Sequence, residues 1–354
     1  MFPPGHSRTL DPDASIRATD NDAALARLSA VQKGYIEDPF VKHLVPRAHL
    51  QPARPPLINI GTFVRSHGID LLVEEWLLMA KASGKKAQIV SLGAGSDTRF
   101  WRLETGTLKD EFVKYIEVDF TEITTKKAMS IRKSKEMNAL LGGAQVSLNY
   151  CVLAGGGTGL RSSKYHLIPA DLRAPPSQAL GSTLTSIEAD EGPVLSPSLP
   201  TLIIFECVLA YMSMEASSTL LEWFIGYASS DAGVLGCVIY EMFNLQDSFG
   251  KMMVNNLKAR SVTLPGAEPF PTLDSLVKRF TDVGFSAGRA LTLKEIKRTY
   301  VDQPELERIS KVEFLDETEE LDLVLDHYAI SWGLYIGNGS ASTWGHWGLK
   351  QKRD

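Results

Sequence analysis

The chain has 354 residues, 44% of them hydrophobic and 22% charged, a composition typical of a soluble globular protein with a buried core. Its formal net charge of −5 argues against nucleic acid as a partner, because phosphate contacts require a basic surface. The three widely spaced cysteines form neither a disulfide framework nor a metal-binding pattern, so we expect free thiols in a reducing compartment and no metal site.

The N-terminal segment, residues 1–20, mixes proline, glycine, serine and charged residues without an apolar run. This composition excludes a secretory signal and predicts a disordered leader. No window of the chain reaches the roughly 18 apolar residues that a membrane span requires. We therefore expect a cytoplasmic protein without membrane contact.

Two helical segments are predicted after this leader. The first covers residues 22–44, where apolar residues recur at near-helical spacing. A proline-rich stretch then breaks the chain, and a second helix is expected over residues 57–80. Residues 21–84 would thus form a helical cap on a single domain that extends over residues 21–354.

Short apolar runs alternate with longer helical segments in the centre of the chain, which predicts an α/β fold with a doubly wound, Rossmann-like parallel sheet. An acidic helix over residues 315–324 and a last strand over residues 327–336 are expected near the C-terminus. The crossover helices are expected within residues 121–141 and 213–229. The five apolar runs that read as buried strands are residues 87–92, 114–118, 166–170, 201–205 and 233–240.

Two segments fall outside this alternation. Residues 173–200 are rich in proline, serine and glycine, which predicts a flexible surface loop. Residues 244–270 follow the fifth strand with methionines and asparagines in a helical pattern. They indicate either a lid or substrate-facing insertion, or a helix that only packs on the domain.

A glycine turn, Gly93-Ala94-Gly95, follows directly on the first predicted strand. The glycines permit backbone angles closed to other residues and let a ligand approach the main chain. Enzymes that bind dinucleotides use a similar turn, but their fingerprint requires a third glycine where this chain has Thr98. Taken alone, the turn leaves a dinucleotide, another nucleoside ligand and a purely structural bend open.

Three acidic residues stand at the ends of the next three predicted strands. Asp119 could accept hydrogen bonds from the hydroxyl groups of a ribose. Asp171 could accept one from the amino group of adenine, while Leu172 packs on the adenine ring. Glu206 would lie beside the reacting end of the ligand. Each acid alone could be a capping or solvated residue, but ligands of such sheets bind at the carboxyl ends of the strands, where all three would meet.

Two cations in the predicted N-terminal helices interrupt apolar surroundings, namely Lys33 and Arg65. They could be surface charges whose stems cover apolar neighbours. They could also clamp a carboxylate, a task for which the fork of an arginine is well suited.

The chain resembles the leucine carboxyl methyltransferases from about residue 22 onward. The resemblance rests on a combination of motifs, none of which is specific by itself. They are residues 33–40 (KGYIEDPF), 61–65 (GTFVR), 92–101 (LGAGSDTRFW), 117–120 (EVDF), 170–173 (ADLR), 205–212 (FECVLAYM), 240–244 (YEMFN) and 314–317 (FLDE).

The resemblance implies a class I methyltransferase that uses S-adenosylmethionine. Its substrate would be the C-terminal leucine carboxylate of the type 2A protein phosphatase catalytic subunit, and the enzyme would act as a monomer. Ser91 stands where many methyltransferases have an acid, so the methionine amino group would find its partners elsewhere. The position of Tyr211 would lie near the substrate carboxylate and act in catalysis with Lys33 and Arg65. The resemblance places at the cofactor Lys33, Arg65, Gly93, Ala94, Gly95, Asp119, Asp171, Leu172 and Glu206.

Two other functions remain open at this point. One is methylation of a small molecule or a modified tRNA base, although the tRNA-modifying relatives carry a long C-terminal β-propeller with no counterpart in this sequence. The other is a regulator that binds the cofactor and the phosphatase without catalysis. A partner surface is suggested only by the position of Arg47, His49, Met252 and Met253.

Overall fold

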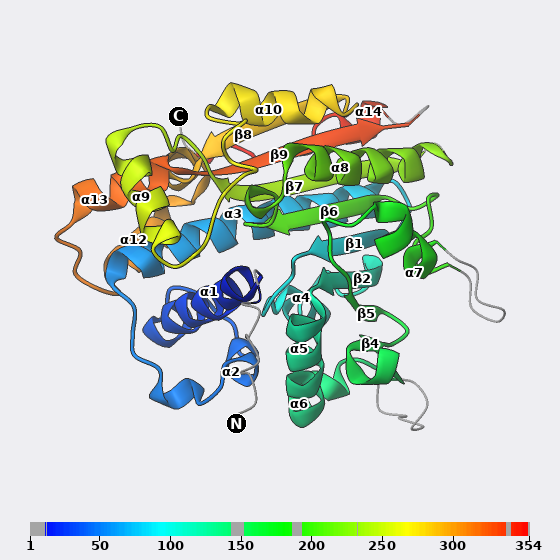
Figure 1. The fold of residues 1–354 in the computed structure, drawn as a ribbon, viewed down its shortest axis with the longest axis horizontal. Coiled ribbons are helices and arrows are strands. Elements are labelled where there is room, and N and C mark those ends of the chain that lie inside the picture. The colour runs from blue at the N-terminus through cyan, green and yellow to red at the C-terminus, as the bar shows by residue number, and fades with distance from the viewer. Residues whose placement is uncertain are drawn as a thin grey trace, which may run out of the picture.

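The structure is a computed structural model and describes residues 11, 13–142, 152–185, 193–231, 233–337 and 341–352. Its centre is a sheet in the strand order β3-β4-β5-β2-β1-β6-β7-β9-β8 (Figure 1). The strands are β1 (Ala87–Leu92), β2 (Phe112–Asp119), β3 (Val152–Ala154), β4 (Gly159–Arg161), β5 (Tyr165–Pro169), β6 (Thr201–Glu206), β7 (Val234–Met242), β8 (Ala287–Thr292) and β9 (Tyr328–Ile336).

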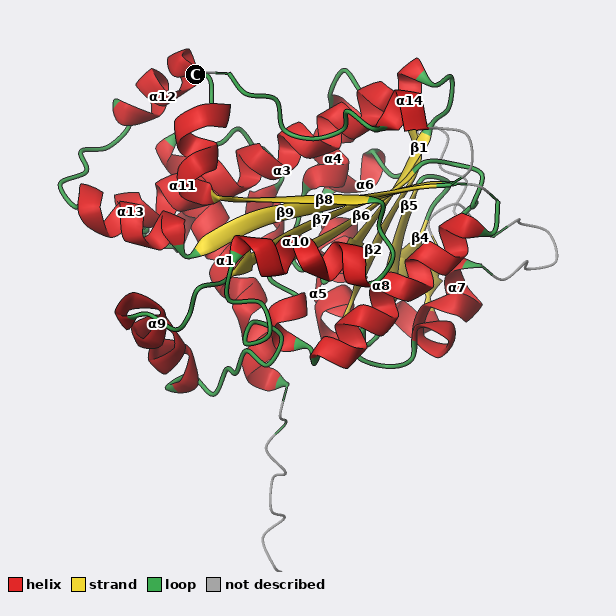
Figure 2. Ribbon diagram, turned by 90° about the horizontal axis from the view of Figure 1, so that it is seen from above, coloured by secondary structure: helices red, strands yellow, loops and turns green. Residues whose placement is uncertain are grey.

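Helices cover both faces of this sheet, as the view from above shows (Figure 2). The longer ones are α1 (Ala14–Lys33), α3 (Pro56–Ala82), α5 (Thr121–Lys133), α8 (Met214–Ser229), α9 (Ser248–Lys258), α10 (Leu273–Asp282), α12 (Gln303–Ser310) and α13 (Thr318–Asp326). The short ones are α2 (Val41–Leu44), η1 (Ala48–Leu50), α4 (Arg99–Thr105), α6 (Lys135–Ala139), η2 (Gly155–Gly157), η3 (Ser177–Gly181), α7 (Ser182–Leu184), η4 (Leu209–Tyr211), α11 (Leu293–Glu295), η5 (Ile296–Tyr300) and α14 (Ala341–Trp344).

The predicted doubly wound sheet is confirmed. β5, β2, β1, β6 and β7 run parallel, and the winding reverses between β1 and β6, which are neighbours. β9 is antiparallel to both of its neighbours, β7 and β8. β3, β4 and β8 were not predicted from the sequence. β3 and β4 have only three residues each, and the first half of β8 is mostly exposed and lacks the apolar run of a buried strand.

The core consists of two layers, one on each face of the sheet. Neighbouring residues of β6 alternate between them, since Leu202 and Ile204 face α3 while Ile203 and Phe205 face α8 and α10. The central parallel strands β1 and β6 are therefore buried at nearly every position, which is why their sequences are largely apolar. This rigid sheet holds the carboxyl ends of five strands in one row.

The first helix differs from its prediction at both ends. α1 begins at Ala14, so residues 14–20 are helical and the disordered leader predicted through residue 20 is wrong for them; residues 1–10 lie outside the described ranges. α1 ends at Lys33 because Gly34 adopts a left-handed conformation (φ 87°), and residues 41–44 form the separate helix α2.

The helix predicted over residues 57–80 is confirmed as α3, whereas the predicted loop over residues 173–200 has more structure than expected. The second helix of the predicted cap, α3, packs on the sheet through fully buried residues such as Trp76. The predicted loop over residues 173–200 contains η3 and α7, whose Leu180 and Leu184 are buried in the core, while residues 186–192 lie outside the description.

None of the helices in the described part of the chain is long and apolar enough to cross a bilayer.

Candidate active site

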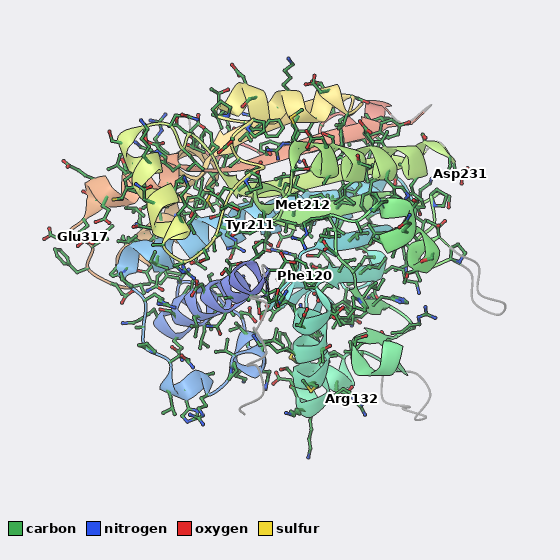
Figure 3. The ribbon with its side chains drawn as sticks, in the orientation of Figure 1. Phe120, Arg132, Tyr211, Met212, Asp231 and Glu317 are labelled. Atoms are coloured by element: carbon green, nitrogen blue, oxygen red, sulfur yellow. The ribbon has the colours of Figure 1, made fainter. Side chains whose placement is uncertain are left out.

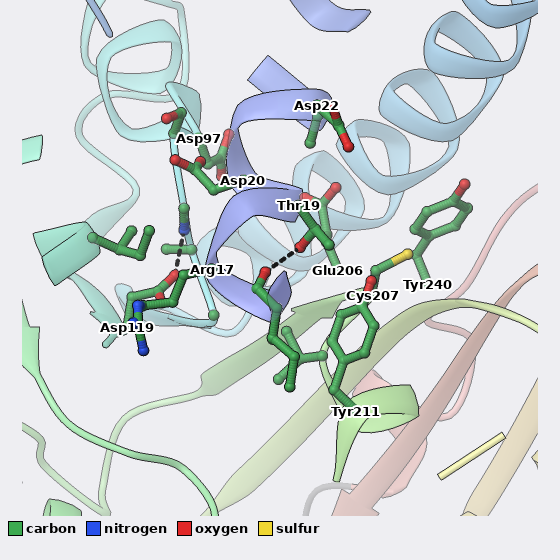
Figure 4. Close-up of a pocket in the computed structure, with 18 of the residues that line it drawn as sticks. Arg17, Thr19, Asp20, Asp22, Asp97, Asp119, Glu206, Cys207, Tyr211 and Tyr240 are labelled. Atoms are coloured by element: carbon green, nitrogen blue, oxygen red, sulfur yellow. Dashed lines mark hydrogen bonds between the residues drawn. The ribbon is translucent and has the colours of Figure 1, made fainter. Parts of the chain in front are cut away.

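A cavity of about 330 Å³ opens at the carboxyl ends of the parallel strands, beside the reversal point between β1 and β6. Tyr211, Met212 and Phe120, which line it, lie near the middle of the molecule (Figure 3). Its floor comes from the segments that follow β1, β2, β5 and β6, and its walls from α1, α3 and α9. Residues that are far apart in the chain thus meet in one pocket (Figure 4).

The glycine turn forms the part of the floor next to β1. Gly93 and Gly95 have φ angles of +67° and +49°, a region that side chains disfavour. Space excludes side chains as well, because a Cβ on Gly93 would lie 2.3 Å from Val208 and one on Gly95 2.8 Å from Asp20. Gly93, Ala94 and Gly95 all line the cavity, as the sequence analysis expected.

Asp119 lies at the end of β2 and contacts this turn directly. Its Oδ2 accepts a hydrogen bond from Gly95 N at 2.7 Å, and its Oδ1 accepts one from Phe120 N at 2.7 Å. Burial raises the pKa of the Asp119 carboxyl to about 6, despite these two hydrogen bonds, and the negative charge of Asp20 adds to the rise. A carboxylate held in this way can accept hydrogen bonds from the hydroxyl groups of a ribose.

Asp171 and Leu172 follow β5 and line the cavity beyond Asp119. Leu172 is buried, whereas Asp171 is more exposed and contacts Arg173. A hydrogen bond from the Arg173 guanidinium lowers the pKa of Asp171, so this carboxylate stays charged at neutral pH. The pair can offer an acceptor and an apolar face to a heterocyclic base, and its assignment to adenine stays a prediction.

Arg65 and Glu206 form an ion pair at the other end of the cavity. Arg65 Nε donates to Glu206 Oε2 at 2.8 Å, and the guanidinium lies on the ring of Tyr240 at 4.7 Å. Burial raises the pKa of Glu206, but the charges of Arg65 and Arg99 outweigh this effect and hold the pKa below its usual value. Arg65 thus enters the cavity already partly neutralised, and Tyr211 lines the same end.

Lys33 is the one predicted site residue that the structure does not bring to the cavity. It is the last residue of α1 and pairs with Glu313 at 2.8 Å, outside the lining residues. The cations of α1 that do line the cavity are Arg17 and Arg27. Each residue of an α-helix is rotated by about 100° from the residue before it. Lys33, six residues after Arg27, therefore points to a different side of α1.

Arg27 is held in place and keeps one group free for a ligand. Its Nε donates to Asp38 at 2.6 Å and its Nη1 to Ser66 at 3.0 Å. Its Nη2 is buried and has no hydrogen-bond partner among the described residues. A buried guanidinium nitrogen without a partner is costly, and a ligand carboxylate would satisfy it.

The sequence analysis also missed Arg17, Thr19 and Asp20, which line the cavity from the first turns of α1. They fell within the predicted leader and were given no role. A signal was present, because the chain contains neither proline nor glycine from residue 13 to residue 33. The apolar spacing that marks a helix was hidden there by polar residues, which face the cavity instead of the core.

The cavity fits S-adenosylmethionine. The glycine turn leaves room for close approach of a ligand, Asp119 offers acceptors for a ribose, and the lining residues Arg27 and Arg65 bring guanidinium groups suited to a carboxylate. Together with the doubly wound sheet, this site defines the fold class as that of the class I S-adenosylmethionine-dependent methyltransferases. In the described ranges, no cluster of three or more His, Cys, Asp or Glu side chains could hold a metal ion.

Comparisons with known proteins carry the assignment further. The family model for leucine carboxyl methyltransferase matches residues 15–225. Leucine carboxyl methyltransferase 1 of Cryptococcus neoformans is 41% identical, with 94% of this chain and 97% of that protein covered. The protein of the same name from Bos taurus is 35% identical, with coverages of 94% and 93%. A solved structure of a putative methyltransferase from Thermobifida fusca is 12% identical, covers 88% of this chain and 94% of its own, and has a TM-score of 0.47.

This chain therefore belongs to the leucine carboxyl methyltransferase family. It is a carboxyl methyltransferase, and its cofactor is S-adenosylmethionine. The resemblance seen in the sequence is thereby confirmed at the level of the family. The family model begins at residue 15, inside α1, which agrees with the helical start of the domain and not with a leader that ends at residue 20.

Proposed function

We propose that the enzyme methylates the α-carboxylate of the C-terminal leucine of the type 2A protein phosphatase catalytic subunit, which forms a leucine methyl ester and regulates phosphatase assembly. The observation that supports this acceptor is the composition of the cavity beyond Glu206. There Arg65 adjoins an apolar group, Met242 with Leu257 and Tyr328 packed around it. A cation beside an apolar wall suits a carboxylate that carries a branched aliphatic side chain.

The reaction needs no general base in this site. An α-carboxyl group has a pKa of about 3.3–3.7 and is ionised at neutral pH. One of its oxygens attacks the methyl carbon while the bond from carbon to sulfur breaks, and the sulfur keeps the electron pair. S-adenosylmethionine supplies the activated methyl group for this step.

The protein's own residues would align the carboxylate and keep water away from it. Alignment of two reactants can lower a barrier by about 7–11 kcal/mol. A cation that gripped the attacking oxygen too strongly would reduce its nucleophilicity. The ion pair with Glu206 limits this effect, since the charge of Arg65 is shared before the substrate arrives.

The test is methyl transfer from labelled S-adenosylmethionine to three acceptors: the intact phosphatase catalytic subunit, its isolated C-terminal peptide, and the same peptide as a C-terminal amide. We expect base-labile label on the intact subunit and none on the amide, which lacks the carboxylate. Labelling of small carboxylic acids alone would favour the small-molecule function. Binding of the cofactor without any turnover would favour a regulator without catalysis.

Comparison of the intact subunit with the peptide also tests the proposed partner surface. Met252 lies on α9 and is 47% exposed, and Arg47 and His49 lie at η1, whereas Met253 packs against the apolar group at Met242. Equal rates on both acceptors would remove the need for contacts with the folded phosphatase. A faster rate on the intact subunit, reduced by Met252→Glu, would support such contacts at α9.

A further inference from the structure

A buried arginine behind the cavity, Arg99, joins three carboxylates from three parts of the fold. It is the first residue of α4 and is only 2% exposed. Its Nε donates to Asp70 of α3 at 2.9 Å, its Nη1 to Asp97 of the glycine turn at 2.7 Å, and its Nη2 to Glu206 of β6 at 3.0 Å. A planar guanidinium can bridge three acceptors in this way, whereas a lysine ammonium acts as a single point.

Two of these three carboxylates belong to the cofactor cavity, but Arg99 does not. Asp97 and Glu206 line the large cavity, whereas Arg99 lines a second cavity of about 130 Å³ on its other side, with Asp70 and Arg102. Arg99 therefore acts from behind the wall and has no contact with the space that a ligand would fill. Asp70 anchors it from the far side.

The contacts of Asp97 and Glu206 leave few alternatives for their orientation. Asp97 Oδ1 accepts hydrogen bonds from the backbone N of Thr98, the N-cap residue of α4, and of Arg99, its first residue, so Asp97 is also tied to the start of this helix. Glu206 divides its two oxygens between Arg99 and Arg65. Without Arg99, one oxygen of each carboxylate would lose its cationic partner, and the two negative charges would face each other.

The number of charges around Arg99 also shows that the two carboxylates of the cavity depend on this arginine. Asp70, Asp97 and Glu206 are balanced by Arg65, Arg99 and Arg102. Loss of Arg99 leaves Asp97 without a cation in direct contact, which is strongly unfavourable in a dry site, whereas loss of Arg102 leaves Asp70 still paired with Arg99. Burial raises the pKa of Asp97 and of Glu206, and Arg99 is among the charges that lower both again.

We propose that Arg99 is a positioning residue of the cofactor site, which fixes the glycine turn relative to the end of β6 by holding Asp97 and Glu206 in one orientation and in the charged state. The inference rests on S-adenosylmethionine as the cofactor and not on the identity of the methyl acceptor. The proposed role of Arg99 can therefore be disproved while the proposed substrate is confirmed, and the proposed substrate can be disproved while the role of Arg99 is confirmed.

The experiment measures the dissociation constant for S-adenosylhomocysteine by calorimetry between pH 6.5 and 8.5. We expect Arg99→Gln to weaken binding at least tenfold at pH 7.5, and the ratio of its Kd to that of the wild type to grow as the pH falls. Glu206 and Asp97 would then take up protons in that range. The groups that act on Glu206 besides Arg99 are Arg65 of α3, Asp97, Cys207 and Tyr240 of β7. Those that act on Asp97 are Arg27, Arg102, Lys127, Tyr115 and Glu117, and all of these groups are common to both proteins.

Arg102→Gln is the matched control. Arg102 shares Asp70 with Arg99, at 2.6 Å, but contacts neither Asp97 nor Glu206. We expect its Kd ratio to stay within twofold at pH 7.5 and to change less with pH than that of Arg99→Gln, since Arg102 lowers the pKa of Asp97 without contacting it. Equal behaviour of the Arg99 and Arg102 variants would overturn the proposal, because the effect would then be a general loss of stability.

A double-mutant cycle of Arg99→Gln with Glu206→Gln provides the second test. The double variant loses one positive and one negative charge, so it stays balanced and can be measured even if Arg99→Gln alone fails to fold. Because Arg99 acts partly through Glu206, adding Arg99→Gln to Glu206→Gln should raise the Kd less than Arg99→Gln does in the wild type, and the contact with Asp97 accounts for the remaining rise. Full additivity of the two losses would contradict the proposal. Arg99→Lys keeps the charge without the three-way contact, and we expect it to lose affinity without the pH dependence.

Discussion

At Asp119, ligand binding and stability oppose each other. The pKa of the Asp119 carboxyl, about 6, lies above its usual value of 3.8. Ionisation of this carboxyl therefore lowers the stability of the folded protein as the pH rises through this range. We expect Asp119→Asn to weaken S-adenosylhomocysteine binding at least tenfold. We also expect it to raise the free energy of unfolding by about 1–2 kcal/mol at pH 8, with a smaller gain at pH 4, where the wild-type carboxyl is largely protonated.

Urea unfolding at the two pH values and calorimetry of ligand binding check this prediction. Asp110→Asn serves as the control, since Asp110 is exposed and lies away from the cavity. Lower stability of Asp119→Asn at pH 8, or unchanged affinity, would contradict the assignment of Asp119 to the ribose. In the wild type, affinity should fall as the pH drops below about 6.

Arg27 and Lys33 offer a direct comparison between the cation that the structure brings to the cavity and the one that the sequence suggested. We expect Arg27→Met to reduce kcat/KM at least a hundredfold, because it removes the unpaired donor of the cavity. Lys33→Met should change kcat/KM less than threefold, since Lys33 forms a partly exposed ion pair that contributes at most about 1 kcal/mol to stability. The reverse order in a steady-state assay would restore Lys33 as a site residue.

At the scale of elements, α1 is the helix that completes the site. Ion pairs tie it to the segments on both sides of the cavity: Asp13 to Arg173 after β5, and Asp22 to Arg260 after α9. Asp20 is tied in addition to Lys126 of α5. The helix thus depends on partners distant in sequence, which explains why its first two turns could not be recognised from local pattern.

Gly266 supports the element that carries Tyr211. Its N–H donates to Ala210 O in η4 at 3.0 Å, and a Cβ at this position would lie 1.9 Å from Leu209 O. Because backbone must move to accept it, we expect Gly266→Ala to lower the free energy of unfolding by about 1–3 kcal/mol and to raise KM for the methyl acceptor. Gly226→Ala, in an open position of α8, should instead be neutral or slightly stabilising.

Urea unfolding and steady-state kinetics on both glycine variants distinguish crowding from a general intolerance of substitution. If Gly266→Ala kept wild-type stability and KM, the loop after α9 would have to move more easily than its contacts with η4 indicate. A rise in KM for the cofactor as large as that for the acceptor would also argue against a specific effect on Tyr211.

At the scale of the whole molecule, the C-terminal segment closes the core far from the cavity. Trp347 donates its indole N–H to Leu72 O at 3.1 Å and packs edge-on against Trp76 at 4.9 Å, while Trp344 contacts the same ring. We expect Trp347→Ala to lower the free energy of unfolding by about 3 kcal/mol. Its kcat at 20 °C should stay within twofold of the wild type, as urea titration and an assay would show.

The order of the parallel strands β1, β2, β5, β6 and β7 could be predicted because buried parallel strands are largely apolar runs and their crossovers are long. The acids at the strand ends could be placed together for the same reason, since parallel strands share one edge. Lys33 could not be excluded, and Arg27 could not be found, because the side of a helix that faces a ligand depends on where the helix is docked. β8 escaped prediction because an edge strand needs no apolar run.

The sequence by itself determined the fold class, the glycine turn and the family, because these depend on local backbone demands and on a motif order that persists along the chain. Only the tertiary structure decided that α1 begins early and closes the cavity with Arg27, and that Arg99 stands behind Asp97 and Glu206. The physical reason is that a buried charge is stable only beside its counter-charges. Those counter-charges come from α3, the glycine turn and β6, which only the folded chain brings together.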